Sequence, residues 1–369
     1  MERTFVNTDR RSGFLPDRIL HLHPTRLCNL ACLHCYSDSG PTQKNTLDFE
    51  QIHYALPLLK AEGYNLISIS GGEPLTYSFL PALIDCAQSQ GFRVTMITNG
   101  LFSTQRINNV ASRLDGIAIS FDGLAITHNR LRGRKDAFEQ ASAAVGWLVD
   151  KGYPVAAAIS LTRSAIPELP DLADHLVGLG VSALQIRPTA LAGRAKTMLG
   201  ASIFSATDQA RLYLVVLALQ QELAGQVRVQ CDLAPAQGLW QQRDTYSTLL
   251  ANCDQLDITC STNQPLAELV NPLVITETGI LKPISYDFNP YFNLTSIDLL
   301  SLETISSYKQ HNLQALQVLI GGALRKLKDC DALVDWFDYC ARLSENQMVE
   351  VNTGSAMEKS RTNATVSIG

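Results

Sequence analysis

The sequence predicts a protein of the α/β class that is built around a parallel β-sheet. From residue 18 to about residue 190, short apolar runs alternate with longer segments of helical period. Each helical segment is long enough to serve as the crossover that two parallel strands require. The expected strands end in cysteine, glycine or polar residues, and parallel barrels place their active sites at such strand ends.

Six strands are expected, each a short apolar run bounded by polar residues or glycine. They comprise residues 19–22, 66–70, 94–98, 116–120, 155–161 and 183–187. The helices expected between them comprise residues 47–62, 79–90, 104–114, 137–151 and 166–179. Gly63, Gly91, Gly152 and Gly180 directly follow four of these helices, and glycine commonly terminates a helix. Six β/α units are too few for a closed eight-stranded barrel.

Composition places the chain among ordinary globular proteins. Its 369 residues suffice for one large domain and a smaller one. Hydrophobic residues make up 46% and charged residues 18%, which excludes a disordered chain. The formal net charge of −5 gives no indication of a nucleic-acid-binding surface. The basic run from residue 130 to 135 is expected to be a solvated loop, with contact to an acidic segment of a substrate as the alternative.

Three cysteines, Cys28, Cys32 and Cys35, lie in one short stretch with the spacing C-x3-C-x2-C. Thiolates select iron–sulfur clusters and zinc. A 4Fe–4S cluster held by three thiolates keeps one iron open, and an open coordination position is typical of catalytic metal sites. The pattern therefore favours an enzyme. The alternative is a structural zinc site with His23 or His34 as the fourth ligand.

The sequence context favours reduced thiols. No signal peptide opens the chain, and no apolar run is long enough to span a bilayer. We therefore expect a cytoplasmic protein without membrane association, whose cysteines are not paired in disulfides. Cys86, inside an expected helix, is expected to be a buried apolar thiol.

These motifs resemble those of the radical S-adenosylmethionine (SAM) superfamily over residues 17 to 200. The resemblance rests on the cysteine motif with Tyr36 after it, on Gly71-Gly72-Glu73-Pro74 and on Ser120-Phe121-Asp122-Gly123. It implies a partial (β/α)6 TIM-type barrel in which the three cysteines hold a 4Fe–4S cluster and SAM chelates the open iron. It also implies reductive cleavage of SAM to a 5′-deoxyadenosyl radical, which abstracts a hydrogen atom from a substrate.

The resemblance also implies which residues surround SAM. Glycines in the Gly-Gly-Glu-Pro motif allow the backbone to approach the ligand closely, and the forked guanidinium of arginine suits the SAM carboxylate. Two alternatives stay open: Asp122 as an ordinary turn residue, and Arg187 or Arg194 as a surface charge. The expected contacts are Tyr36, Gly71, Gly72, Glu73, Pro74, Asn99, Ser120, Asp122, Ser160, Arg187 and Arg194.

Residues 201–344 resemble a degenerate SPASM or twitch extension of the same superfamily, a smaller α+β domain. A hairpin is expected over residues 273–284, where Ile284 takes the place of the usual cysteine. The remaining cysteines are expected to hold one auxiliary iron–sulfur cluster, to be scattered structural thiols, or to include a hydrogen-atom donor. They are Cys231, Cys253, Cys260, Cys330 and Cys340. Residues 1–16 are expected to form an N-terminal arm and residues 345–369 a flexible tail.

The order of core and extension most resembles enzymes that modify ribosomally made peptides. We therefore expect a radical SAM enzyme that modifies a precursor peptide by crosslinking, epimerisation or backbone excision. Few residues precede the first strand, so a separate small partner protein is expected to bind the peptide leader. The resemblance implies ferredoxin or flavodoxin as electron donor. The alternatives are a radical SAM enzyme acting on a tetrapyrrole or cofactor precursor, and a non-catalytic Fe–S or zinc-binding protein.

Overall fold

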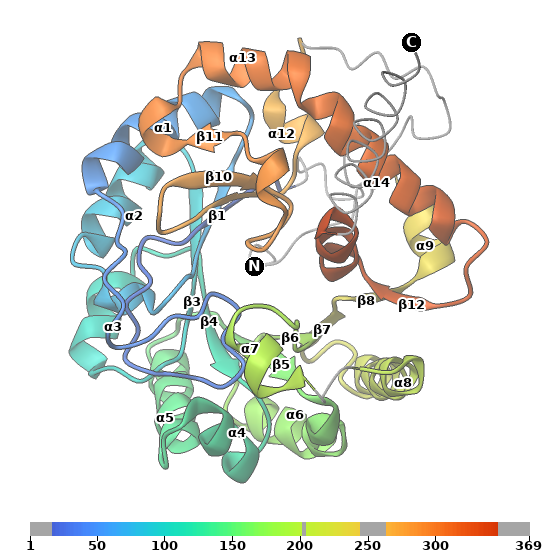
Figure 1. Ribbon diagram of the computed structural model, residues 1–369. Coiled ribbons are helices and arrows are strands. Elements are labelled where there is room, and N and C mark those ends of the chain that lie inside the picture. The colour runs from blue at the N-terminus through green and yellow to red at the C-terminus, as the bar shows by residue number, and fades with distance from the viewer. Residues whose placement is uncertain (1–16, 201–203, 244–262, 346–369) are drawn as a thin grey trace, which may run out of the picture.

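Six parallel strands form the centre of the protein, as the sequence predicts (Figure 1). The computed structural model describes residues 17–200, 204–243 and 263–345. The strands are β1 (Ile19–Leu22), β2 (Leu66–Ile69), β3 (Arg93–Thr98), β4 (Gly116–Phe121), β5 (Val155–Leu161) and β6 (Ala183–Pro188). Each strand pairs in parallel with the next. The α/β class and the partial parallel barrel are confirmed.

Helices cover the outer side of this sheet (Figure 1). The predicted ones are α1 (Phe49–Ala61), α2 (Leu80–Ser89), α3 (Thr104–Ala111), α5 (Ala137–Asp150) and α6 (Leu169–Gly178). Their buried apolar side chains and those of the strands form one continuous core. Helix α6 begins later than predicted because a 3-10 segment, η3 (Arg163–Glu168), precedes it and Pro170 occupies its first turn.

The sequence did not predict helix α4 (Ala125–Arg132). Its residues are mostly polar, so they show no apolar helical period, and the helix ends at Gly133 in the left-handed conformation with φ 67°. The basic run is thus partly helical. Arg132 is only 7% exposed, so the prediction of a solvated loop is wrong for this arginine, which pairs with buried Asp122.

The C-terminal region extends the sheet at both edges. The strand β7 (Arg228–Cys231) pairs in parallel with β6, and β9 (Leu273–Ile275) pairs in parallel with β1. The expected hairpin is present as β9 and β10 (Ile280–Pro283), and β11 (Thr295–Ser296) follows it in the sheet. The sheet order is β11-β10-β9-β1-β2-β3-β4-β5-β6-β7. A separate antiparallel pair joins β8 (Leu233–Pro235) to β12 (Leu333–Asp335).

Further helices and 3-10 turns complete the structure. The core also contains η2 (Pro74–Thr76) and α7 (Arg194–Met198). The C-terminal region contains α8 (Ala206–Glu222), α9 (Ala236–Gln241), α12 (Leu266–Leu269), η5 (Pro290–Phe292), η6 (Ile297–Leu299), α13 (Leu302–His311) and α14 (Leu313–Leu327). Among the residues with a described structure, no helix has the length and hydropathy needed to cross a bilayer. The expected N-terminal arm, almost all of the expected tail, Cys253 and Cys260 lie outside the described residues.

Small side chains line the inner face of the sheet. Ala118, Ala156 and Ala183 are neighbours in the register of β4, β5 and β6. With Ile97 and Ala158 they form a small apolar cluster that is separate from the main core. The inner face of these three strands is thus built from small residues.

Candidate active site

The cysteine motif lies in a loop that follows β1. Isolated bridges between Thr25 and Thr46 and between Leu27 and Gly40 fold the loop back on itself. Cys28 is buried, whereas Cys32 and Cys35 are partly exposed. The Leu30 N–H points to the Cys28 sulfur at 3.4 Å, and the Ser39 N–H to the Cys35 sulfur at 3.2 Å. Such backbone donors stabilise thiolates and tune iron–sulfur clusters.

The surroundings of Cys28 and Cys32 disfavour their thiolate forms. The pKa of Cys28 is raised to about 12 and that of Cys32 to about 11, mainly by burial and in part by negative charge on neighbouring thiols. Three thiolates this close need a cation to ionise together. No three His, Cys, Asp or Glu side chains in the described ranges meet at a single-ion position. Three thiols in one loop, with backbone N–H groups directed at two of the sulfur atoms, form a donor set that fits an iron–sulfur cluster.

The first two residues of the Gly-Gly-Glu-Pro motif pack against the start of the cysteine loop. The Gly72 N–H donates to the Thr25 carbonyl at 2.8 Å. A Cβ atom on Gly72 would lie 2.3 Å from the Leu27 carbonyl oxygen, and one on Gly71 would lie 3.0 Å from the Thr25 carbonyl oxygen. Both glycines are therefore explained by the close approach of their backbone to the backbone of the cysteine loop. Contact with SAM stays a prediction.

Glu73 connects the ends of β2 and β3. Its buried carboxylate accepts hydrogen bonds from the Leu75 N–H at 3.1 Å, the Thr98 hydroxyl at 2.6 Å and the Asn99 N–H at 2.8 Å. Burial raises the pKa of Glu73 to about 7, although these hydrogen bonds oppose the shift. The Asn99 amide in turn donates to Asn29 in the cysteine loop at 2.7 Å. Sequence reasoning missed Asn29, which carries no motif signal of its own.

Three of the predicted SAM contacts lie on adjacent strands. Ser120 is the register partner of Ala158, and Ser160 is the register partner of Arg187. The alternation of β-strands places them on the inner face with the alanine cluster. The Arg187 side chain is 48% exposed and lies 2.9 Å from the carboxylate of Asp232, just after β7. Sequence reasoning missed Asp232, because only the fold brings β7 beside β6.

Tyr36 contacts the C-terminal region through two aromatic rings. Its hydroxyl lies 3.4 Å from His23 Nε2, and the His23 ring stacks on Tyr286 with centroids 4.9 Å apart. The Tyr286 hydroxyl donates to both Glu277 carboxylate oxygens, at 3.0 and 3.1 Å. Burial raises the pKa of Tyr36 to about 12 and lowers that of His23 to about 3. His23, Tyr286 and Glu277 were not predicted to lie beside Tyr36.

Asp122 is fully buried and bound to charged partners within the protein. The Arg132 guanidinium donates to it from Nε at 2.5 Å and from Nη2 at 3.0 Å. His34 Nε2 lies 3.0 Å from Asp122 Oδ1, the oxygen that also accepts from Arg132 Nη2. Burial alone would raise the pKa of Asp122, but Arg132 and His34 hold it well below its usual range. The carboxylate thus has charged partners within the protein, and contact between Asp122 and SAM stays a prediction.

Arg194 holds the cysteine loop. Its guanidinium donates to the Cys32 carbonyl at 2.6 Å, the Ser39 carbonyl at 2.6 Å and the Asp38 carboxylate at 3.1 Å. Its backbone N–H donates to the Cys35 carbonyl at 2.9 Å. The side chain is 19% exposed, so the alternative of a surface charge is wrong. Contact between Arg194 and SAM stays a prediction.

The other cysteines lie apart from the motif. Burial raises the pKa of Cys231, at the end of β7, to about 12 and that of Cys340 well above its usual value. Cys330 is partly exposed. An auxiliary cluster on these residues stays a prediction. Cys86 is also partly exposed and lies 3.3 Å from His53 Nδ1, which corrects the expectation of a buried apolar thiol.

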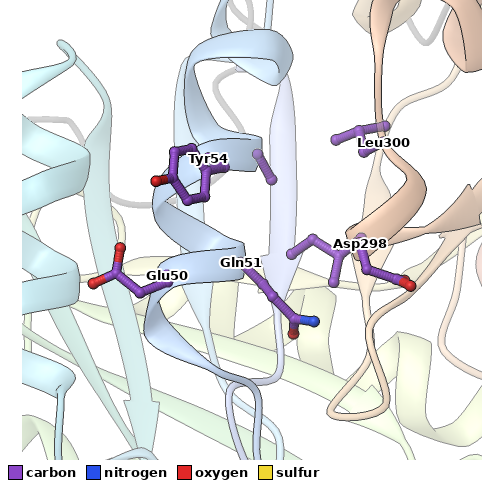
Figure 2. A pocket seen from close by; sticks show the side chains of 7 residues that line it. Glu50, Gln51, Tyr54, Asp298 and Leu300 are labelled. Atoms are coloured by element: carbon purple, nitrogen blue, oxygen red, sulfur yellow. The ribbon is translucent and has the colours of Figure 1, made fainter.

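A surface hollow lies outside the barrel. Figure 2 shows it between α1 and the segment that contains Asp298 and Leu300. Its volume is about 360 Å³, and it is lined by Glu50, Gln51, Tyr54, Ala55, Ile297, Asp298 and Leu300. None of the expected site residues lines this hollow.

The partial parallel barrel and the position of the cysteine loop agree with the fold that the sequence predicts for residues 17–200. Residues 22–180 match the family model described as the Radical SAM superfamily. This part of the chain is therefore a radical SAM domain, and the family is one of enzymes.

Curated relatives carry the same domain. The chain is 27% identical over 163 residues to the antilisterial bacteriocin subtilosin biosynthesis protein AlbA of Bacillus subtilis (43% of this chain, 36% of AlbA). It is 30% identical over 176 residues to the sporulation killing factor maturation protein SkfB of the same organism (47% and 43%). It is also 30% identical over 199 residues to an AdoMet-dependent heme synthase of Oleidesulfovibrio alaskensis (52% and 50%). The chain thus spans half or less of the length of these relatives.

Solved structures show the same fold. Streptococcus suis SuiB bound to its precursor peptide SuiA superposes with a TM-score of 0.55 at 13% identity, covering 72% of this chain and 58% of SuiB. Native anSMEcpe with bound AdoMet superposes with a TM-score of 0.61 at 14% identity, covering 91% of this chain and 99% of that chain. At these identities the likeness establishes the fold alone.

Proposed function

We propose that this protein is a radical SAM enzyme that holds a 4Fe–4S cluster on Cys28, Cys32 and Cys35. The observation that carries the proposal is that the loop holding these thiols packs against the strand ends: the Asn99 amide, just after β3, lies 4.0 Å from the Cys28 sulfur and donates to Asn29 at 2.7 Å. When bound, the cluster and SAM supply one-electron reductive cleavage of SAM and abstraction of a hydrogen atom from the substrate.

Residues of this chain shape the SAM site in three ways. The glycine turn at Gly71 and Gly72 brings the end of β2 against the cysteine loop. Glu73 fixes the end of β3 to the same turn. Arg187, which is half-exposed and has Asp232 on one side, has donors left to bind a carboxylate such as that of SAM. Tyr36 and the rings of His23 and Tyr286, which meet it edge to face, would shield one side of the site from water.

The substrate that we propose is a ribosomally made precursor peptide. AlbA and SkfB are named for the biosynthesis or maturation of peptide products, and SuiB was solved with a precursor peptide. A low-potential ferredoxin or flavodoxin as electron donor and a separate leader-binding protein belong to the same proposal.

A tetrapyrrole or cofactor precursor is the second candidate substrate. The match to an AdoMet-dependent heme synthase favours it, with a similar identity and a similar share of the chain. The two candidates differ in a binding measurement. If the substrate is a tetrapyrrole, the absorption spectrum of the tetrapyrrole should change when it is added to the purified protein. If the substrate is a precursor peptide, the spectrum of an added tetrapyrrole should stay unchanged.

The experiment that tests the reaction is anaerobic. The protein is reconstituted with iron and sulfide, reduced with dithionite, mixed with SAM and assayed for 5′-deoxyadenosine. The variant with Cys28→Ala, Cys32→Ala and Cys35→Ala should produce none, whereas Cys86→Ala, a cysteine outside the site, should match the wild type. Iron that the triple variant retains would indicate an auxiliary cluster. Bound zinc in the wild type, or iron without SAM cleavage, would refute the proposal.

A further inference from the structure

A buried ion pair lies beside the cysteine loop. Asp122 is 0% exposed and Arg132 is 7% exposed, and two hydrogen bonds of 2.5 and 3.0 Å join them in a bidentate arrangement. Charges are this deeply buried in proteins only when they are paired, because losing water costs each of them several kcal/mol. The pair lies just after β4 and at the end of the unpredicted helix α4.

Two contacts attach this pair and its helix to the loop between the second and third cysteines. His34 Nε2 lies 3.0 Å from Asp122 Oδ1, and the Leu33 N–H donates to the Leu131 carbonyl at 2.8 Å. Leu33 and His34 are the two residues that separate Cys32 from Cys35. Displacing the end of α4 would therefore displace two ligand cysteines.

The charges of the pair act on the thiols. Burial raises the pKa of Cys32, and among its charged neighbours Arg132 lowers that pKa more than Asp122 raises it. In return, negative charge on Cys32 and Cys28 raises the pKa of Arg132, after the effects of burial and of Asp122. Geometry places the charge at the same point: the Arg132 Nη2 and the His34 Nε2 both lie 3.0 Å from Asp122 Oδ1, so the guanidinium lies beside the two residues that separate Cys32 from Cys35.

We propose that Arg132, oriented by Asp122, is a positioning residue for the cysteine loop whose fixed positive charge makes the bound cluster easier to reduce. The inference rests on the proposed function, because it needs a cluster on Cys28, Cys32 and Cys35. Reduction adds one negative charge to the cluster. A cation held nearby in a site of low dielectric stabilises the reduced form more than the oxidised form.

The test measures the midpoint potential of the reconstituted cluster by a titration monitored with electron paramagnetic resonance, with iron and sulfide counted per chain. In Arg132→Gln the ratio of reduced to oxidised cluster at a fixed potential should fall by about tenfold, which is about 59 mV for one electron. Arg132→Lys keeps the charge and should recover most of this loss. Asp122→Asn removes the opposing charge and should shift the potential upward.

Arg194→Gln is the matched control. Arg194 also contacts the cysteine loop and lowers the pKa of Cys32, but Arg132 has the larger effect. Arg194 is also more exposed and pairs with a half-exposed Asp38, so water screens its charge more. Its removal should lower the potential by less than the removal of Arg132.

The outcomes separate the inference from the proposed function. A wild-type protein without a cluster refutes the proposed function and the inference with it. A wild-type cluster whose potential is unchanged in Arg132→Gln refutes the inference alone, as does a downward shift in Asp122→Asn. If Arg132→Gln does not fold, Arg132→Lys and Asp122→Asn decide. The inference is supported if the midpoint potential rises in Asp122→Asn and stays near the wild-type value in Arg132→Lys. Any other result refutes it.

Discussion

Replacing Gly72 by alanine should damage the cysteine loop through one added methyl group. The new Cβ would lie 2.3 Å from the Leu27 carbonyl oxygen, 2.8 Å from the Arg26 carbonyl carbon and 2.9 Å from the Leu27 carbonyl carbon. All three contacts are with backbone, so no side chain can move aside. Relief requires the loop to move by the better part of an ångström immediately before Cys28. Overpacking of this kind costs about 1–3 kcal/mol.

We expect the melting temperature of Gly72→Ala to fall by roughly 2–12 °C, from about 2–4 °C per kcal/mol in domains of 150–250 residues. Reconstituted iron per chain should fall as well. The matched control is Gly146→Ala in α5, where an added Cβ meets no atom within 4 Å. Alanine there should stabilise the helix by about 0.5–1 kcal/mol. Wild-type melting and full iron loading in Gly72→Ala would show that the loop position does not depend on this contact.

Three further predictions concern groups around the site. Burial raises the pKa of Glu73 to about 7 from an ordinary value of 4.5, so the folded chain binds more protons than the unfolded chain between these pH values. The free energy of unfolding should therefore fall by up to about 3 kcal/mol as pH rises from 4.5 to 7. The urea midpoint of Glu73→Gln should lack this dependence on pH. Arg194→Ala should lose iron to a chelator several-fold faster than the wild type, because three acceptors of the cysteine loop lose their donor; equal rates would contradict the assigned role. Tyr286→Phe should cost about 1–3 kcal/mol in urea unfolding, because buried Glu277 loses a donor, whereas the exposed control Tyr291→Phe should stay within about 0.5 kcal/mol; equal effects would refute this reasoning.

The barrel was readable from the sequence because its signals are local. Each strand is a short run of apolar residues, and β1 and β5 occupy the residues expected for them. Glycines after helices are equally local, since a left-handed residue there ends the helix whatever surrounds it. Helix α4 was missed for the same reason: its residues are mostly polar, and only its contacts with Asp122 and the cysteine loop hold it in place.

The site was only partly readable. Residues in the loops that follow strands, such as Cys28 and Glu73, could be assigned to one edge of the sheet because parallel strands all end there. Partners contributed by distant segments could not. Tyr286 reaches His23 only because β9 and β10 join the sheet beside β1, and nothing near Tyr286 in the sequence indicates that contact. Burial of Arg132 within a basic run depends in the same way on tertiary structure.

The pairing of β1 with β9 has a consequence for the time course of biosynthesis. Leu20 in β1 pairs on one side with Ile67 and on the other with Leu273. While the chain is being translated, β2 emerges early, but β1 keeps an unsatisfied edge until residues 273–275 have left the ribosome. Unsatisfied strand edges promote aggregation, and contacts between such distant residues form slowly. The strand that leads into the three cysteines therefore completes its pairing late, so cluster insertion is expected to follow synthesis of the C-terminal region.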